Sequence, residues 1–148
     1  LVEATSFVVN TSYGEGQCLP LMEFMSSGKP AIAPANTAML DYLSEENAFI
    51  VDCTPELTAW PHDPRAAYRT LRYIPVWDSI HDAYKRSYQV AHHVPEQYRK
   101  MSEQAIASLE RFCSQDVALQ RLQAFLTELL ANPRHSPRLP EAAQCLPS

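Results

Sequence analysis

The feature that most constrains this sequence is a short apolar run that leads through a glycine-bearing loop directly into a helix-like segment. Residues 6–10 are rich in β-branched side chains and predict a buried strand. Residues 11–17 carry Gly14 and Gly16, in a chain with only 3 glycines against 12 prolines. Glycine is used where the backbone turns sharply or is closely approached. We therefore expect a tight loop here and a helix from about Cys18.

Two further apolar runs follow that helix. Pro20 is tolerated in its first turn because the missing N–H would be unpaired there, and Gly28 is expected just after its end. Residues 31–33 and 48–51 predict two more buried strands, with one or two helical turns over residues 37–43. The order strand, helix, strand, turn, strand implies parallel pairing with right-handed crossovers. We therefore predict an α/β fold with a partial, Rossmann-like parallel sheet.

The second half of the sequence has the pattern of several helices. Residues 54–63 are expected to form a loop, and Asp63 with Pro64 predicts a helix through about Tyr73. Ser114 is expected to cap the last helix. We expect Trp60 and Trp77 to pack helices onto the sheet. The second and third helices are predicted from two apolar stripes at helical spacing: Trp77, Ile80, Tyr84, Tyr88 and Ala91, then Tyr98, Met101, Ala105, Leu109 and Phe112.

The predicted elements suggest one incomplete domain over residues 1–131. A doubly wound sheet has about five or six strands, so we expect further strands before Leu1 and interpret the chain as a fragment. Residues 132–148 are Pro-rich and polar, which predicts a disordered tail.

Composition limits the classes of partner. The formal net charge of −5 gives no indication of a broad nucleic-acid-binding surface. The 4 cysteines lack metal-ligand spacing and do not suggest a disulfide framework, so we expect a reducing, cytoplasmic compartment and no metal site. The sequence has no run of about 18 apolar residues that could span a membrane.

The loop and the helix start together predict an anion site. Backbone N–H groups at a helix start have no intrahelical partner, and the helix dipole adds about half a positive charge, which suits a phosphate or pyrophosphate. Glu15 lies in the loop. Glu23 lies about five residues into the predicted helix, which is about 7–8 Å along the axis from the helix start. It shares a helix face with Leu19 and Gly16. That distance suits a ribose whose phosphate is held at the helix start, because a carboxylate accepts hydrogen bonds from both hydroxyls of a cis-diol.

The same stretch resembles the Glu-x7-Glu motif of retaining GT-B glycosyltransferases of group 1 (glycosyltransferase family 4-like). The family pattern is roughly Glu-Gly-Phe-Gly-Leu-Pro-Leu-x-Glu-Ala-Met-x-x-Gly-x-Pro-Val. The resemblance covers most of residues 1–130 and is strong over residues 6–52. The positions that match in register are Glu15, Gly16, Leu19, Pro20, Leu21, Glu23, Met25, Gly28 and Pro30.

The resemblance implies a function and a role for each matched residue. It implies transfer of a sugar from a nucleotide-diphosphate donor, such as a UDP- or GDP-sugar, with retention and without a metal or another cofactor. Glu15 is then the catalytic-site carboxylate that contacts the donor sugar, and Glu23 holds the ribose. The diphosphate is bound by the backbone amides of Gly16, Gln17, Cys18 and Leu19.

The implied context is polysaccharide or glycolipid biosynthesis. The acceptor, a sugar or a lipid-linked sugar, is bound by a domain that this chain lacks, and peripheral membrane association of the whole enzyme is compatible with such an acceptor. The isolated chain is expected to be inactive.

Two departures from the family pattern keep an alternative open. Gln17 replaces the usual Phe and Cys18 the usual Gly, so the Cβ of Cys18 lies where the family backbone approaches phosphate. Asn36 and Thr37, after the second predicted strand, are further candidate donor-binding residues. The alternative is a non-catalytic nucleotide-sugar-binding or scaffolding module.

Overall fold

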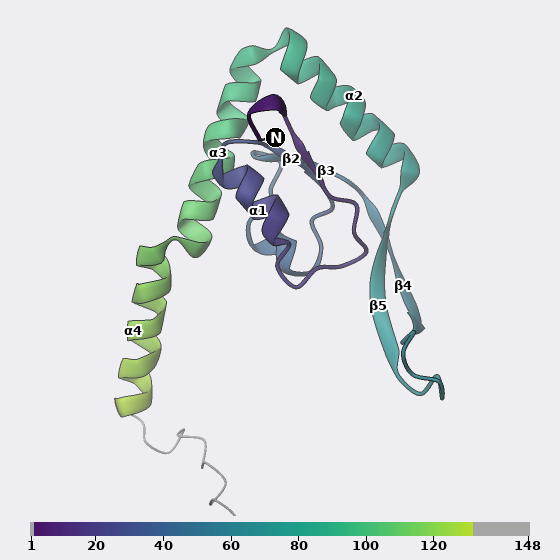
Figure 1. Cartoon of the computed structure of the whole chain (residues 1–148), viewed down its shortest axis with the longest axis vertical. Helices are drawn as coiled ribbons and strands as arrows, with labels where there is room; N and C mark the ends of the chain where they lie inside the picture. The colour runs from purple at the N-terminus through teal and green to yellow at the C-terminus, as the bar shows by residue number, and fades with distance from the viewer. Residues whose placement is uncertain (1, 132–148) are drawn as a thin grey trace, which may run out of the picture. The chain divides into compact units, whose positions relative to one another are not determined.

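Three short parallel strands form the centre of the fold (Figure 1). The computed structural model describes residues 2–131. Its elements are, in chain order, the 3-10 helix η1 (Val2–Ala4), β1 (Val8–Val9), α1 (Leu19–Ser26), β2 (Ala31–Ala33), the 3-10 helix η2 (Thr37–Asp41), β3 (Ala48–Ile50), β4 (Cys53–Ala59), β5 (Arg69–Pro75), α2 (Trp77–His93), α3 (Pro95–Cys113) and α4 (Gln115–Ala131).

The sheet has the order β1-β2-β3, and both pairings are parallel, as predicted. Val8 is in register with Ala31, and Ala31 with Ala48. The backbone N–H of Asn10 extends the first pairing by donating to the carbonyl of Ile32 at 3.0 Å. The carboxyl ends of the three strands therefore lie along one edge of the sheet, where the loop after β1 begins.

Both faces of the central strand β2 are covered, as its apolar character requires, whereas the edge strand β1 is not buried as predicted, because Val9 is 41% exposed. All three residues of β2 are buried. Ala31 and Ala33 belong to one core cluster with Leu21 and Met25 of α1, whereas Ile32 belongs to a second cluster with residues of α2. Figure 1 shows α1 and α2 around the sheet. Helix α3 contributes Ala105 and Leu109 to the first cluster and Met101 to the second.

Helix α1 ends as predicted. Its C-cap is Ser27, and Gly28 follows with φ of +76°, a left-handed conformation that favours glycine. A Cβ built on Gly28 would lie 2.7 Å from Ser102 Oγ of α3. That hydroxyl donates to the carbonyl of Gly28 at 2.7 Å. Gly28 is therefore required both by its dihedral angle and by the approach of α3.

The prediction of a helix from Asp63 to Tyr73 is wrong, and so is that of a loop over residues 54–63. The structure has an antiparallel hairpin there, in which Cys53 pairs with Pro75 and Ala59 with Arg69. Asp63 does cap backbone N–H groups, but in a turn instead of at a helix start. The strands form because residues far apart in sequence pair with each other, which no local helix signal reports.

The carboxylate of Asp63 organises the connection between β4 and β5. Its oxygens accept the backbone N–H groups of Arg65 at 3.1 Å, Ala67 at 2.8 Å and Tyr68 at 3.0 Å. These hydrogen bonds, of which that from Tyr68 has the largest effect on the pKa, hold the pKa of Asp63 below its ordinary value. The turn therefore depends on a charged Asp63.

The apolar stripe predicted for α2 coincides only in part with the buried face, because Ile80 packs against the second core cluster but the aromatic members of the stripe do not. Trp77, Tyr84 and Tyr88 are exposed, and so is Trp60, so the expected packing of the two tryptophans onto the sheet is also wrong. The prediction was made from the helical spacing of large apolar side chains. The face of α2 that packs closely has room mainly for small side chains. The residues of α2 that are buried are Ala83, Ser87 and Val90.

The last two helices begin where the sequence predicts. Met101, Ala105 and Leu109 of the predicted α3 stripe are buried. In α4, the hydroxyl of Ser114 accepts the N–H of Val117 at 3.3 Å, which confirms the predicted cap.

The chain separates into one compact unit that ends at Phe112 and a second that begins at Cys113. The predicted single domain over residues 1–131 spans this boundary, which falls at the last residue of α3. The predicted tail, residues 132–148, lies outside the described residues. No helix in the described part of the chain has both the length and the hydropathy needed to cross a bilayer.

We expect Gly28→Ala to destabilise the chain by about 2 kcal/mol, because a left-handed non-glycine residue costs about 1–2 kcal/mol and the Ser102 hydrogen bond must also shift. Thermal or urea unfolding measures this change. Gly16→Ala is the matched control. A Cβ on Gly16 meets no atom within 4 Å, so its unfolding free energy should change by less than about 0.5 kcal/mol. Equal losses in the two variants would contradict the role of Gly28.

We expect acid to loosen the β4–β5 turn. Because the pKa of Asp63 is lowered in the folded chain, its stabilising effect is present above the unfolded pKa of about 3.9 and is lost as pH falls through the folded pKa. In an NMR titration, the amide protons of Ala67 and Tyr68 should shift together with a midpoint below about 3.9. In Asp63→Asn this common titration should vanish. A midpoint at or above the ordinary value contradicts the arrangement.

Candidate functional site

The loop after β1 lies against the start of η2. The backbone N–H of Glu15 donates to Thr37 Oγ1 at 2.9 Å, and Thr37 Oγ1 donates to Asn36 Oδ1 at 3.1 Å. Thr37 has φ of +47°, a strained value for a β-branched residue. Asn36 is buried. The structure thus brings Asn36 and Thr37 to the loop that carries Glu15.

Asn10, which the sequence analysis missed, holds the two ends of this loop together. Its Nδ2 donates to Glu15 Oε1 at 3.3 Å and also contacts the sulfur of Cys18. Its Oδ1 accepts the backbone N–H of Ser12 at 2.6 Å. The sequence does carry a signal for Asn10, because it is a polar residue at the end of an apolar run. A side chain at that position lies at the edge of the sheet and not in the core.

Cys18 is the N-cap of α1 and has φ of 56° and ψ of 62°, the left-handed conformation. Such a conformation costs a non-glycine residue about 1–2 kcal/mol. Its thiol packs partly against the core cluster below α1, and this burial raises the thiol pKa. Cys18 therefore acts as a packing residue in a backbone geometry that favours glycine.

A shallow pocket of about 460 Å³ lies between the end of β1 and the start of α1. Glu15, Cys18 and Leu19 line it, whereas Gly16, Gln17 and Glu23 do not. Its volume is within the range of small-molecule sites. The pocket is open, and its wall combines one carboxylate with mainly apolar groups. The full lining is Val8, Val9, Asn10, Glu15, Cys18, Leu19, Pro20 and Leu21.

The start of α1 offers backbone donors to this region. Leu21 and Met22 both donate to the carbonyl of Cys18, at 3.1 and 3.2 Å. Within residues 2–131, the N–H groups of the four predicted residues, Gly16, Gln17, Cys18 and Leu19, have no hydrogen-bond acceptor. The phenol of Tyr42 donates to the carbonyl of Gln17 at 2.9 Å and fixes this part of the loop. The free amides and the dipole of α1 favour an anion here.

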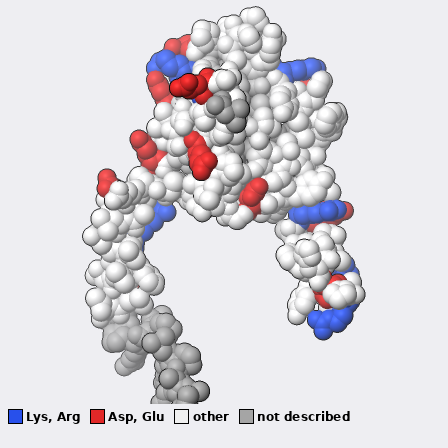
Figure 2. All heavy atoms as spheres, viewed as in Figure 1, with Lys and Arg blue, Asp and Glu red and all other residues white. Residues whose placement is uncertain are grey.

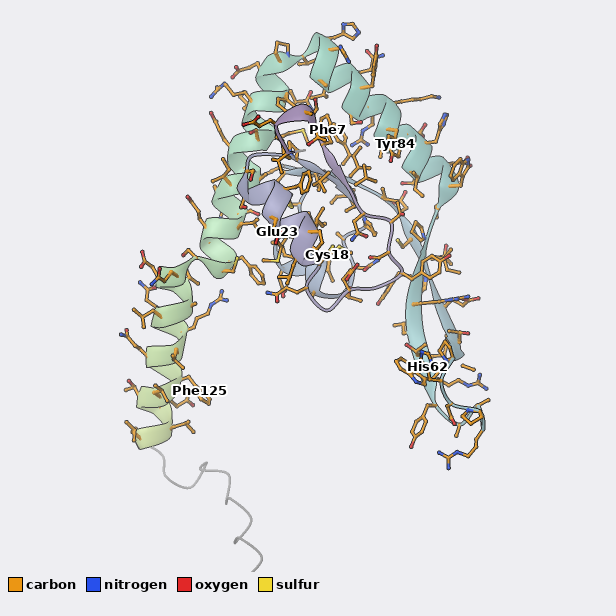
Figure 3. The ribbon with its side chains drawn as sticks, in the orientation of Figure 1. Phe7, Cys18, Glu23, His62, Tyr84 and Phe125 are labelled. Atoms are coloured by element: carbon orange, nitrogen blue, oxygen red, sulfur yellow. The ribbon has the colours of Figure 1, made fainter. Side chains whose placement is uncertain are left out.

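Glu23 lies on the exposed side of α1, four residues after Leu19, which is also exposed. Figure 3 labels Glu23 on this helix and Cys18 just before its start. No group in the described part of the chain binds the Glu23 carboxylate, so both of its oxygens are available to a ligand.

The β4–β5 hairpin anchors the loop from the other side. The backbone N–H of Tyr73 donates to the carbonyl of Tyr13 at 2.7 Å. The guanidinium of Arg72 lies 5.4 Å from the centre of the Tyr13 ring, a cation–π contact. Both contacts join residues about sixty positions apart, so the sequence carried no signal for them.

Comparisons of the chain with protein families, with curated proteins and with solved structures found no match. In the described range, residues 2–131, there is no group of three or more His, Cys, Asp or Glu side chains arranged to hold a metal ion.

We expect Thr37→Val to loosen the Glu15 loop without unfolding the chain, because valine keeps the shape of threonine and removes the acceptor of the Glu15 N–H. The net value of one hydrogen bond is about 0.5–1.5 kcal/mol, so hydrogen exchange at that amide should accelerate about 2- to 12-fold. Thr54→Val is the same type of change on β4 and should leave the hydrogen-exchange rate of the Glu15 amide unaltered. Unchanged exchange in Thr37→Val would show that the loop is held by other contacts.

Proposed function

We propose that this chain forms part of the nucleotide-sugar-binding side of a retaining glycosyltransferase with a Rossmann-like, GT-B type donor domain. The observation that carries the proposal is the junction of Glu15, the free amides at the start of α1 and the pocket beside them. It combines an anion-binding helix start with a carboxylate at one edge of a parallel sheet.

The backbone of Cys18 supports the resemblance from which this proposal began. The glycosyltransferase motif has glycine at this position, and Cys18 has the left-handed conformation that glycine adopts most easily. The Cβ at this position is accommodated by packing toward the core cluster.

The order of the strands also supports a Rossmann-like origin. In doubly wound sheets of order 3-2-1-4-5-6, the last three strands are neighbours in sequence order and are all parallel, as β1, β2 and β3 are here. Ligands of such sheets bind beyond the carboxyl ends of the strands, which is where the loop with Glu15 lies.

Each candidate residue has a role that its placement permits. The amides of Gly16, Gln17, Cys18 and Leu19 donate to the donor diphosphate, because they have no acceptor among the described residues. Glu15, at the pocket wall, accepts a hydrogen bond from a hydroxyl group of the transferred sugar. Glu23, one helical turn beyond Leu19, accepts the ribose hydroxyls.

Asn36 and Thr37 act indirectly, by holding the Glu15 loop. Transfer itself needs an acceptor held on the opposite side of the donor, because transition-state stabilisation requires both reactants to be positioned together.

One observation favours the non-catalytic alternative. The carboxylate of Glu15 already accepts a hydrogen bond from Asn10, so one of its oxygens is partly satisfied within the chain. A nucleotide-sugar-binding module without turnover is compatible with this arrangement. Both the transferase and the non-catalytic module are expected to bind a nucleotide, so binding does not distinguish them. A measurement of turnover in a protein that joins this chain to an acceptor-binding domain does distinguish them.

The proposal is tested by titrating the chain with UDP and with GDP, using calorimetry or ligand-observed NMR. We expect saturable binding of one of them. Glu23→Ala should weaken it by about 1–3 kcal/mol, the range for hydrogen bonds to a charged group. Glu46→Ala, an exposed acid that lines a separate surface pocket, is the matched control and should leave affinity unchanged.

Gly16→Ala separates binding from folding, because it is expected to be neutral for stability and to hinder a ligand that approaches the backbone. Absence of binding by a folded chain, or equal effects of Glu23→Ala and Glu46→Ala, contradicts the proposed site.

A further inference from the structure

The outer half of the β4–β5 hairpin, residues 57–71, carries an unusual set of exposed side chains. We call it the hairpin tip. Leu57 is 67% exposed and its cross-strand partner Leu71 is 52% exposed. Trp60 is 47% and Tyr68 63% exposed. His62, labelled in Figure 3, lies in the connection between the strands. None of these side chains belongs to a core cluster among the described residues.

The apolar side chains of the hairpin tip lie on both faces of the ribbon. Successive residues of a strand point to opposite faces. Leu57 and Leu71 therefore share one face, whereas Trp60 and Tyr68, which pair through a backbone hydrogen bond of 3.0 Å, lie on the other. One flat protein surface would cover only one of these faces. The interfacial layer of a membrane, into which the ribbon inserts, would cover both faces.

The inward-facing backbone groups of the hairpin tip are satisfied within the ribbon, whereas those of the pairs Leu57–Leu71 and Ala59–Arg69 face its two outer edges. The strands pair without interruption from Cys53–Pro75 to Ala59–Arg69. In the connection, Asp63 accepts three backbone N–H groups, and Asp63 N and Ala66 N donate to carbonyls at 3.0 Å. The paired groups lower the cost of entry into a less polar layer, and the outward groups find hydrogen-bond partners in the hydrated headgroup region of a membrane.

Addition of another strand to the β4 edge is disfavoured. Pro55 pairs with Tyr73, whose N–H points out of the hairpin to Tyr13, so this pair makes no hydrogen bond across the ladder. The outward position of β4 at Pro55 consequently lacks a donor. Proline at such a position blocks edge-to-edge pairing. Pro55 therefore disfavours the addition of a strand along the base of β4, next to the hairpin tip.

The charge that the hairpin tip presents outward is positive, although the chain carries a formal net charge of −5. Residues 57–71 contain Arg65 and Arg69 and a single acid, Asp63. Arg65 Nε lies 3.5 Å from Asp63 Oδ1, but the Arg65 side chain is 75% exposed, whereas that of Asp63 is only 6% exposed and also accepts backbone N–H groups. Figure 2 shows basic side chains at the end of the hairpin.

We propose that the hairpin tip docks onto an anionic membrane surface. Leu57, Leu71 and Trp60 enter the interfacial layer, where aromatic side chains are favoured. Arg65 and Arg69 pair with lipid phosphates, and the aliphatic parts of their side chains extend along the apolar layer. The proposal does not depend on the proposed transferase function, because it uses residues outside the candidate site.

The test uses the emission of Trp60 in the full chain. The variant Trp77→Phe removes the second tryptophan, so that Trp60 alone reports. Vesicles of phosphatidylcholine with about 30% phosphatidylglycerol should shift its emission to the blue, whereas pure phosphatidylcholine vesicles should not. The complementary variant Trp60→Phe leaves Trp77 as the reporter, and its emission should not shift.

Charge variants identify the surface. Arg65→Glu/Arg69→Glu should lower vesicle partitioning at least about tenfold, since each cation near an anionic surface contributes about 1 kcal/mol. Lys85→Glu/Lys100→Glu makes the same net charge change on exposed helix positions and should have little effect. The variant Arg65→Gln/Arg69→Gln removes the two charges without adding acids, and unchanged Trp60 emission in buffer shows that its hairpin still folds. Its vesicle partitioning should lie between those of the two Glu double variants.

The proposal is overturned if Trp60 does not shift with anionic vesicles, or if both Glu double variants reduce partitioning equally. It is also overturned if Leu57→Ser/Leu71→Ser leaves partitioning intact. Sedimentation without lipid gives a further decisive outcome, because self-association that this last variant abolishes would assign the apolar tip to a protein contact.

Discussion

The fold depends on covering both faces of a parallel sheet whose strands are only 2 or 3 residues long. Such strands make few ladder hydrogen bonds, so side-chain burial has to supply most of the stability. Alternation along β2 divides this burial, with two alanines facing α1 and Ile32 facing α2. The small side chains of β2 also let α1 approach closely. Since α1 is fixed by that packing, its first turn stays at the carboxyl edge of the sheet, where the candidate site lies.

The loop between β1 and α1 is held by contacts from three separate parts of the chain. Asn10 binds it from the end of β1, Thr37 from η2, and Tyr73 from the hairpin. Two non-glycine residues at the site, Cys18 and Thr37, keep left-handed backbone conformations. Strain of this kind persists only where surrounding contacts fix the backbone, and it is concentrated at functional sites. The same hairpin whose base fixes this loop carries the tip that we propose for membrane docking. The proposed donor site and the proposed membrane contact, both in one unit, would suit a lipid-linked acceptor.

Local signals predicted the elements whose causes are local. Gly28 ended α1 because its neighbours in sequence require a left-handed residue, and Ser114 capped α4 through a residue three positions away. The hairpin was missed for the opposite reason. Asp63 and Pro64 carry helix-start chemistry, and Asp63 does bind backbone N–H groups, but the pairing of residues 53–59 with residues 69–75 decided the conformation around them. The buried face of α2 was missed because spacing cannot show that the helix packs closely through Ala83 and Ser87.

The sequence by itself determined the parallel sheet, the loop that opens into α1, and the position of Glu15 and Glu23 along that segment, because each follows from periodicity, glycine placement and capping over a few residues. Tertiary structure alone decided what surrounds them. It placed Asn10 against Glu15, turned Cys18 toward the core, and brought Tyr73 to the loop. It also left Glu23 free of any partner among residues 2–131. The reason is physical: these contacts join strand ends, loops and a distant hairpin, and their geometry exists only after the sheet has brought those segments together.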